Sequence, residues 1–313
     1  MSTPILILGE ALMDCITQAD GGLLPLMGGS PFNLARATAL QGGQVGYLSP
    51  FSSDAFGQQL KACSIADEVQ PMSPDSARPT SLAVVTVRAG QPSYGFYREG
   101  IADRSYTVDG VLQLLASVPP NPGLKVLHTG SLMLVPPENV KVMRVIEGAR
   151  ALGWTISIDV NLRPRVADDL AGYCAAVMQA VELADWVKAS DEDLEILGFG
   201  HASLATADAL RQRFARGANR RIAFTFGAAG AYLWIDGQSA MAAAPQVELV
   251  DTVGAGDTFW GSRLADWGTR PEGAAERAAA TLQRAMQAAA INCSRKGCQP
   301  PRLAELTQDE TMK

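Results

Sequence analysis

A glycine-rich turn that carries a carboxylate is the part of this sequence best suited to chemistry. Gly254 and Gly256 flank Ala255, and Asp257 follows at once, where a segment with helical spacing begins. Backbone N–H groups at a helix start bind anions, because they lack partners within the helix and lie at the positive end of its dipole. A neighbouring aspartate could deprotonate a hydroxyl while the amides stabilise a moving phosphoryl group. The pattern therefore indicates phosphoryl transfer, although loop glycines and a capping aspartate are the structural alternative.

A second polar pattern lies near the N-terminus. Residues 5–8 predict a buried central strand, and Asp14 is expected at a strand end, where open α/β sheets bind ligands. Gly28 and Gly29 precede a predicted helix, and Asn33 in its first turn could cap that helix or contact a ligand. The glycine fingerprint of dinucleotide-binding folds does not follow the first strand, which argues against a nicotinamide-dependent dehydrogenase.

The segment D-T-V-G-A-G-D-T-F, residues 251–259, resembles the C-terminal signature of the PfkB (ribokinase-like) carbohydrate kinases residue for residue. The resemblance implies that Asp257 is the catalytic base and that the amides of Gly254, Ala255 and Gly256 form an anion hole. It also implies ATP as the phosphoryl donor, Mg²⁺ as its counter-ion, and in many members a monovalent cation such as K⁺.

Residues 28–35 resemble the other signature of the same family, G-G-x-x-x-N-x-A. There the resemblance implies that Gly28, Gly29 and Asn33 contact sugar hydroxyls, and Asp14 is expected to help hold the acceptor sugar.

Two arginines resemble the substrate-binding residues of the fructokinase-like and 2-keto-3-deoxygluconate-kinase-like branches. Arg98 lies in the segment 97–103, and a solvated surface arginine is the alternative for it. Asn161 and Arg163 lie in the D-x-N-x-R-P run at 159–164 and would face the substrate. The planar guanidinium of Arg163 could hold either a carboxylate or a hydroxyl-rich sugar.

On the nucleotide side, the run K-x-S-D-E at 188–192 resembles fructokinase-like members, and it implies nucleotide-binding roles for Lys188 and Ser190. The family pattern N-x-x-E, which binds the water shell of magnesium, is replaced here by Ser190 and Asp193. A serine-capped helix with acidic residues in its first turn is the alternative. The sequence therefore identifies no metal ligands.

A further nucleotide-binding segment is expected between two strands. Thr225, Gly227 and Gly230 match the T-x-G-x-x-G pattern that contacts phosphates and ribose in the family. A C-terminal helix is predicted over 272–291, and Asn292 in the tail after it would help to cover the adenine.

The alternation of helical and strand patterns predicts an α/β fold: a doubly wound, mostly parallel sheet with helices on both faces. Residues 1–313 are expected to form a single ribokinase-like domain. A small β-sheet lid is expected from about 10–30 and 80–105, including a hairpin of residues 81–88 and 93–98 across a turn at 89–92.

Composition restricts the class of protein. Of the 313 residues, 47% are hydrophobic and 19% charged, and the formal net charge is −6, which argues against a nucleic-acid partner. Five scattered cysteines, no signal peptide and no long apolar run indicate a cytoplasmic protein without a membrane partner. His128 lies on an apolar strand and is expected to be a core residue.

Together these patterns predict ATP-dependent phosphorylation of a primary hydroxyl of a sugar, with fructose as the favoured acceptor. The alternatives are 2-keto-3-deoxygluconate as the substrate and a catalytically silent sugar-binding regulator on the same fold. Lids in this family often pair across a homodimer, but the lid here is short, so the oligomeric state is left open.

Overall fold

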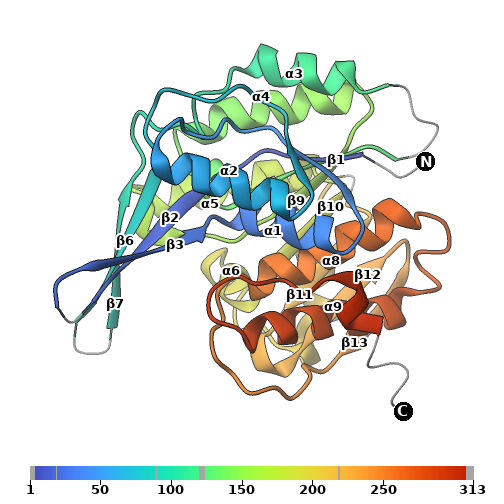
Figure 1. Ribbon diagram of the computed structural model, residues 1–313. Helices are drawn as coiled ribbons and strands as arrows, with labels where there is room; N and C mark the ends of the chain where they lie inside the picture. Colours follow the sequence, from blue (N-terminus) through green and yellow to red (C-terminus); the bar gives the residue numbers. More distant parts are fainter. Residues whose placement is uncertain (1–3, 19, 89–90, 120–123, 218, 308–313) are drawn as a thin grey trace.

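Two β-sheets organise the chain in the computed structural model, which describes residues 4–18, 20–88, 91–119, 124–217 and 219–307 (Figure 1). The strands of the larger sheet are β1 (Pro4–Ile7), β4 (Gln44–Tyr47), β5 (Val69–Pro71), β8 (Val126–Gly130), β9 (Thr155–Asp159), β10 (Trp186–Ser190), β11 (Arg221–Thr225), β12 (Ala231–Ile235) and β13 (Gln238–Ala242). Their order is β13-β12-β11-β10-β9-β8-β1-β4-β5, and only the pairs β11–β12 and β12–β13 are antiparallel. The chain therefore reverses its direction of winding at β1, and ligands bind beside such a switch point.

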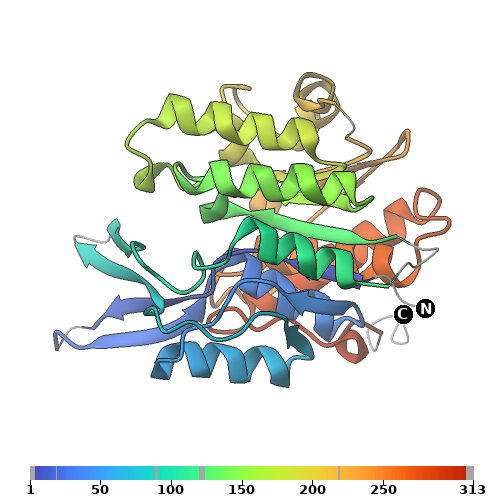
Figure 2. The ribbon, with the colours of Figure 1, turned by 90° about the horizontal axis from the view of Figure 1, so that it is seen from above.

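The helices cover both faces of this sheet (Figure 2). The helices are α1 (Ser30–Leu40), α2 (Ala55–Ala66), α3 (Val108–Ser117), α4 (Glu138–Ala151), α5 (Leu170–Leu183), α6 (Asp191–Ile196), α7 (Ala207–Phe214), α8 (Ala255–Thr269), α9 (Ala278–Cys293) and α10 (Leu303–Thr307). Helices α3, α4 and α5 contribute to one hydrophobic core, and α1, α8 and α9 contribute to the other.

The alternation of side chains along the strands separates these two cores. In β1, Ile5 and Ile7 belong to the core beneath α1 and α8, whereas Leu6 belongs to the core beneath α4. The continuous apolar run at this position in the sequence follows from its burial on both faces. His128 in β8 is 1% exposed and contacts Ser157 through Nδ1 at 3.0 Å, so it is a core residue, as predicted.

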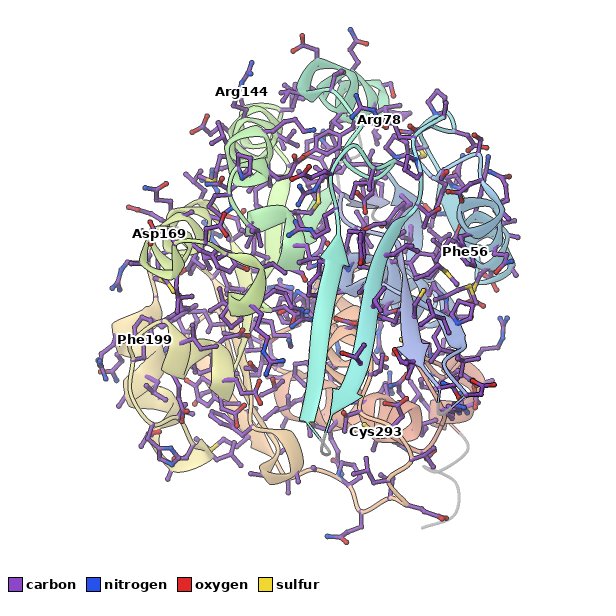
Figure 3. The ribbon with its side chains drawn as sticks, turned by 90° about the vertical axis from the view of Figure 1, so that its left-hand side faces the viewer. Phe56, Arg78, Arg144, Asp169, Phe199 and Cys293 are labelled. Atoms are coloured by element: carbon purple, nitrogen blue, oxygen red, sulfur yellow. The ribbon has the colours of Figure 1, made fainter. Side chains whose placement is uncertain are left out.

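A separate sheet of four strands is present beside the larger sheet, as predicted for the small β-sheet. Its strands are β2 (Leu12–Thr17), β3 (Leu23–Gly28), β6 (Ser81–Arg88) and β7 (Gln91–Tyr97), in the order β3-β2-β6-β7. Figure 3 views the protein with β6 and β7 toward the reader, in front of the larger sheet. The turn predicted at 89–92 lies partly outside the described residues.

Helices α1 and α8 pack closely although they come from opposite ends of the chain. Gly261 permits this contact: a Cβ atom there would lie 2.8 Å from Cβ of Ala37 and 3.0 Å from the carbonyl oxygen of Leu34. All eleven residues of α1 are buried. The close approach brings the first turns of the two helices together at the same edge of the sheet.

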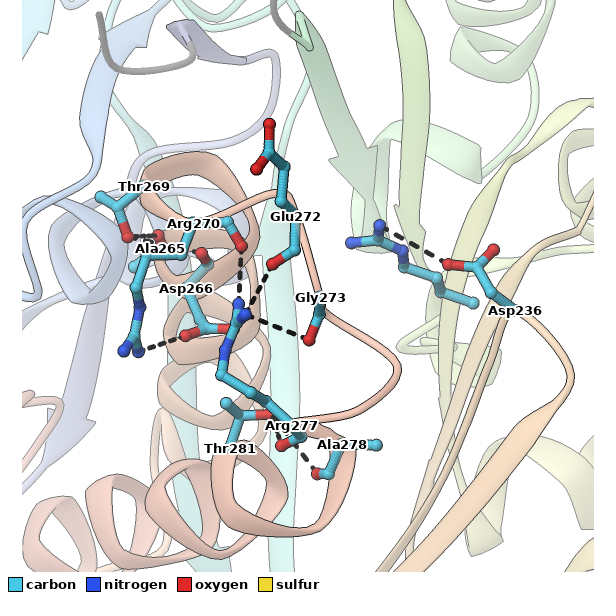
Figure 4. Close-up of polar contacts among 11 residues, drawn as sticks. Asp236, Ala265, Asp266, Thr269, Arg270, Glu272, Gly273, Arg277, Ala278 and Thr281 are labelled. Carbon is cyan, nitrogen blue, oxygen red and sulfur yellow. Dashed lines mark hydrogen bonds and ion pairs between the residues drawn. The ribbon is translucent and has the colours of Figure 1, made fainter.

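The far end of α8 is fixed by a network of arginines (Figure 4). The carboxylate of Asp266 accepts a hydrogen bond from Arg270. Arg277 donates to the backbone oxygens of Arg270, Glu272 and Gly273, and so holds the connection from α8 to α9. These contacts explain why α9 begins at Ala278: the segment 272–277, which was predicted to be helical, forms turns instead.

One further difference from the predicted elements concerns function. Asp14 does not lie at the end of the first strand, since β1 ends at Ile7 and Asp14 is inside β2 of the small sheet. The chain leaves β1 after Ile7 and starts a new strand at Leu12 in another sheet, a change that apolar patterning does not reveal. None of the helices among the described residues is long and apolar enough to span a membrane.

Candidate active site

A cavity of about 740 Å³ lies where the small sheet faces the carboxyl ends of the larger sheet's strands. Leu12 and Ile16 of β2 and Leu26 of β3 contribute apolar walls. Ten of the sequence-predicted site residues line it: Asp14, Gly29, Asn33, Asn161, Arg163, Lys188, Gly254, Ala255, Gly256 and Asp257. The ten residues come from five separate stretches of the chain, which therefore meet in one place.

Asp257 lies in the first turn of α8 and is 7% exposed. Its Oδ1 accepts a hydrogen bond of 2.6 Å from the hydroxyl of Ser30, and its Oδ2 accepts one of 3.0 Å from the amide of Asn33. Burial raises the pKa of Asp257, while these two hydrogen bonds and the charge of Lys188 oppose the rise. Asp257 is thus a buried carboxylate at the cavity wall, fixed in orientation and more basic than a surface aspartate.

The turn that presents Asp257 depends on its glycines. Gly254 caps α8 with φ of 75°, a left-handed conformation that glycine adopts without strain. A Cβ atom at Gly254 would lie 2.3 Å from Sγ of Cys298, so the C-terminal tail packs directly on the turn. The amide of Ala255 donates to the carbonyl of Thr252 over 3.2 Å, so it would have to leave Thr252 before it could bind an anion.

The paired glycines at 28 and 29 allow two close approaches. A Cβ atom at Gly28 would lie 2.2 Å from Oδ2 of Asp14, and one at Gly29 would lie 2.4 Å from the carbonyl oxygen of Glu10. Gly28 does not line the cavity itself; it leaves room for the Asp14 carboxyl that does. Burial raises the pKa of Asp14 to about 6, with Arg163 opposing the rise and Asp257 adding to it.

The two predicted substrate arginines differ in position. Arg163 lines the cavity, and Asn161 precedes it in a left-handed conformation with φ of 36°. Arg98 is not among the residues that line the cavity, and its guanidinium donates a hydrogen bond of 3.0 Å to the carbonyl of Leu132. The structure therefore brings one of the two arginines to the cavity and uses the other to hold a loop on its rim.

Lys188 is the buried partner of Asp159. Its Nζ lies 2.9 and 3.0 Å from the two carboxylate oxygens of Asp159, and both residues are at least 96% buried. Burial lowers the pKa of Lys188, but Asp159 and Asp193 outweigh that effect and raise it overall. A Cβ atom at Gly256 would lie 3.0 Å from this Nζ, so the ion pair packs directly against the glycine turn.

Ser190 and Asp193 form a capping box at the start of α6. The Ser190 hydroxyl accepts from the amide of Asp193, and one Asp193 oxygen accepts from the amide of Ser190 over 2.8 Å. The other oxygen accepts from the amide of Leu162 over 2.7 Å, which joins α6 to the Arg163 loop. The capping alternative is therefore realised in the structure.

Among the described residues, no group of three or more His, Cys, Asp and Glu side chains could hold a metal ion.

The other predicted nucleotide residues lie at the same edge of the sheet but outside the cavity. Thr225 ends β11 in register with Ser190 of β10, and Gly227 and Gly230 form the turn to β12. Asn292 is fully buried, donates to the carbonyl of Val253 and accepts from the amide of Gln299, so it ties the glycine turn to the tail. Nucleotide contacts for these residues stay predictions.

Three residues of the site were not recognised as such in the sequence: Ser30, Glu10 and Asp159. Ser30 precedes Asn33 by three residues, and a helix places such residues on the same face, so the spacing could have indicated it. Glu10 lies three residues after the end of β1, near the switch point, and lines the cavity. Asp159 and Lys188 face each other in register on neighbouring strands, a pairing that requires the strand order.

Known proteins resemble the chain along its whole length. The model of the pfkB family carbohydrate kinase matches residues 3–305. A fructokinase of Vibrio alginolyticus is 31% identical over 277 residues, which cover 85% of this chain and 86% of that protein. The crystal structure of the fructokinase from Vibrio cholerae O395 with fructose, ADP and calcium ion bound has a TM-score of 0.79 at 25% identity, covering 98% of both chains. That of the Xylella fastidiosa fructokinase with bound ATP has a TM-score of 0.82 at 24% identity, covering 99% and 100%.

This protein belongs to the pfkB family of carbohydrate kinases. The predicted family, the predicted fold with its small second sheet, and the predicted class of enzyme, an ATP-dependent sugar kinase, are confirmed.

Proposed function

We propose that this enzyme transfers the terminal phosphoryl group of ATP to a primary hydroxyl of fructose. The hydroxyl oxygen attacks the γ-phosphorus, the bond from that phosphorus to the bridging oxygen breaks, and ADP leaves with the electron pair. The hydroxyl proton moves to the carboxylate of Asp257. The observation that supports this reaction most directly is the buried Asp257 carboxylate at the cavity wall, held by Ser30 and Asn33.

The start of α8 supplies the electrostatic part of the reaction. Gly254, Ala255 and Gly256 line the cavity beside Asp257, at the positive end of the helix dipole. The amides of Gly254 and Gly256, together with that of Ala255 once it leaves the Thr252 carbonyl, would stabilise the charge that spreads over the moving phosphoryl group.

Magnesium fits the site as a partner of the nucleotide. Mg²⁺ in kinases is held by one or two carboxylates together with the substrate phosphates, and the exposed Glu192 lines the cavity. Both oxygens of Asp193 already accept backbone amides, so Glu192 is the residue that would approach the hydrated ion. When bound, the ion would neutralise phosphate charge. A monovalent cation would lie near Asp251, whose carboxylate already fixes the amides of Val253 and Gly297.

Fructose is favoured over 2-keto-3-deoxygluconate by the position of the arginines. A sugar acid needs a cation for its carboxylate, and Arg98, the second candidate, is engaged with the Leu132 carbonyl. The relatives named above are fructokinases, which supports the same choice.

The test is ADP release by the purified protein with ATP and magnesium, supplied in turn with fructose, 2-keto-3-deoxygluconate and ribose. Fructose is expected to give the highest kcat/KM. A higher kcat/KM with 2-keto-3-deoxygluconate than with fructose would identify the sugar acid as the substrate. Sugar binding by calorimetry without ADP release from any acceptor would identify a silent regulator.

We also propose that the small sheet is the site of dimer formation. Its two edge strands carry exposed apolar side chains, since Leu23 of β3 is 53% exposed and Tyr97 of β7 is 65% exposed. Sedimentation equilibrium of the wild type and of Tyr97→Asp tests this: a dimer that the substitution dissociates is expected, and a monomeric wild type contradicts it.

Reduced cysteines and the use of ATP fit a cytoplasmic enzyme.

A further inference from the structure

Two neighbouring buried carboxyl groups, of which Glu10 lines the cavity, have oxygens without a hydrogen-bond partner. Glu10 lines the cavity, is 3% exposed, and its Oε2 has no partner among the described residues. Asp103 is also 3% exposed, and neither of its carboxyl oxygens has a hydrogen-bond partner among the described residues. Buried polar atoms are nearly always paired in native proteins, so an unpaired carboxyl at a cavity wall indicates a missing ligand group.

The surroundings of Glu10 decide which of the two acids carries charge. Burial raises the pKa of Glu10 to about 7, while the nearby Arg163 opposes the rise and Asp257 adds to it. Burial raises the pKa of Asp103 well above its usual range, and the charges of Glu10 and Glu138 raise it further. Burial therefore favours the neutral form of Asp103 strongly, and Glu10, beside Arg163, is the acid of the pair that ionises more readily.

The described part of the chain offers the Glu10 carboxyl a side-chain hydrogen bond from Ser131, which lowers its pKa, but it leaves Oε2 without a partner. On one side, the backbone of Glu10 is covered by Gly29, where a Cβ atom would lie 2.4 Å from the Glu10 carbonyl oxygen. On the other side is the cavity, whose acidic lining also includes Asp14, Glu192, Asp251 and Asp257. An acceptor aimed into a cavity of this kind requires a donor from the ligand, and a sugar hydroxyl is such a donor.

We propose that the Glu10 carboxylate accepts a hydrogen bond from a hydroxyl of the acceptor sugar and makes the cavity selective for uncharged sugars over sugar acids. This inference rests on the proposed function and refines its substrate class. A sugar hydroxyl satisfies the buried acceptor, and charge assistance strengthens the bond. A sugar carboxylate would place a further negative charge among Glu10, Asp14 and Asp257, with Arg163 in the same cavity as a compensating charge, and such juxtaposition discriminates against the wrong ligand.

The first experiment combines substitutions of Glu10 with sugars that lack one hydroxyl, so that the hydroxyl bound by Glu10 can be identified. Steady-state ADP release is measured for the wild type, Glu10→Gln and Glu10→Ala with fructose and with fructoses that lack a single hydroxyl. In the wild type, one deoxy sugar is expected to lose about 10- to 100-fold in kcat/KM, the usual effect of a hydrogen bond to a charged group. In Glu10→Ala, that same deoxy sugar is expected to show no further loss, whereas the other deoxy sugars lose as much as they do in the wild type.

The second experiment compares a neutral with an acidic sugar. The kcat/KM ratio of 2-keto-3-deoxygluconate to fructose is expected to rise at least about 10-fold in Glu10→Gln, because the isosteric amide removes the repelling charge. Glu182→Gln, the same change at an exposed glutamate of α5, is the control and should leave the ratio unaltered. A purely structural role of Glu10 would lower both activities equally. Equal losses for every deoxy sugar together with an unchanged ratio would overturn the inference.

Failure of the proposed function can be recognised separately. If the wild type releases no ADP with fructose, calorimetric binding of the sugar to the wild type and to Glu10→Gln decides the matter. Binding that is weakened about 10-fold or more by Glu10→Gln would retain the role of Glu10 in a non-catalytic sugar site. Equal binding, or none to either protein, would overturn it.

Discussion

The hydroxyl of Ser30 donates a 2.6 Å hydrogen bond to Oδ1 of Asp257, although 227 residues separate the two in the sequence. The contact joins the first turn of α1 to the first turn of α8, on the same side of the larger sheet. It orients the carboxylate proposed as the base and shifts its pKa downward, against the effect of burial.

Asp257→Asn should lower kcat by roughly 10²–10⁴-fold, which is the usual contribution of a general base. The amide can still accept from Ser30 but cannot take a proton at neutral pH, so the KM for the sugar should change little. Steady-state ADP release measures both constants. A variant with near-normal turnover would exclude Asp257 as the base.

Ser30→Ala should move the acidic limb of the kcat–pH profile to higher pH. The Ser30 hydrogen bond stabilises the ionised form of Asp257 and thereby lowers its pKa, so its removal raises that pKa and protonates the base over a wider pH range. The matched control is Ser64→Ala, because Ser64 is fully buried in α2 and its hydroxyl donates to the Lys61 carbonyl. The two profiles should differ; if they coincide, Ser30 does not tune Asp257.

Lys188→Met should destabilise the fold by about 3–5 kcal/mol, because it leaves the carboxylate of Asp159 buried without its partner. Urea unfolding measures the loss. Lys61→Met, which breaks the half-exposed pair with Asp75, is the control and should cost about 0–1 kcal/mol. Unchanged stability with weaker ATP binding would instead support the nucleotide-binding role predicted for Lys188.

Gly261→Ala should destabilise the protein by about 1–3 kcal/mol, in spite of the better helix propensity of alanine. The new methyl group would meet the backbone of α1, which cannot yield without moving the first turns of both helices. Gly148→Ala in α4 is the matched control, because its methyl would meet only the flexible end of Leu112. Thermal unfolding should show a larger loss at Gly261 than at Gly148.

Asp103→Asn should stabilise the protein at pH 7 and have little effect at pH 4. Burial raises the folded-state pKa of Asp103 above the unfolded value near 3.8, so the folded protein binds this proton more tightly. Its contribution to stability is therefore fully present below the unfolded pKa and is lost as the pH rises toward the folded pKa. Asparagine removes this pH dependence, and urea unfolding at the two pH values measures the difference. Equal effects at pH 4 and pH 7 would show that Asp103 ionises normally in the folded state.

The sequence was sufficient to predict the parts of the site that lie on short, local motifs. The glycine turn with Asp257 and the Gly28-Gly29 pair need only their own neighbours to form, so their patterns are visible in one stretch of chain. The ion pair of Lys188 with Asp159, and the contact of Ser30 with Asp257, depend on which strands and helices become neighbours in space. Patterning does not give that order.

The misplacement of Asp14 has the same origin. An apolar run followed by a polar residue indicates where a strand ends but not where the chain goes next. Only the parallel pairing of β2 with β6 makes Leu12–Thr17 part of the small sheet and turns Asp14 toward the cavity. The resemblance of segment 97–103 placed Arg98 at the substrate, and the Leu132 carbonyl to which its guanidinium donates in the structure belongs to another segment, which the local motif does not reveal.

The burial of α1 on every side has a consequence for the synthesis of this protein. Helix α1 leaves the ribosome early, but α8, which covers it, is encoded more than two hundred residues later. During most of translation, the apolar surface of α1 that will meet α8 has no permanent cover, and Asn33 and Ser30 have no carboxylate to hold. The nascent chain therefore depends on protection of that surface until its last quarter emerges, and it gains a complete cavity only at the end of its own synthesis.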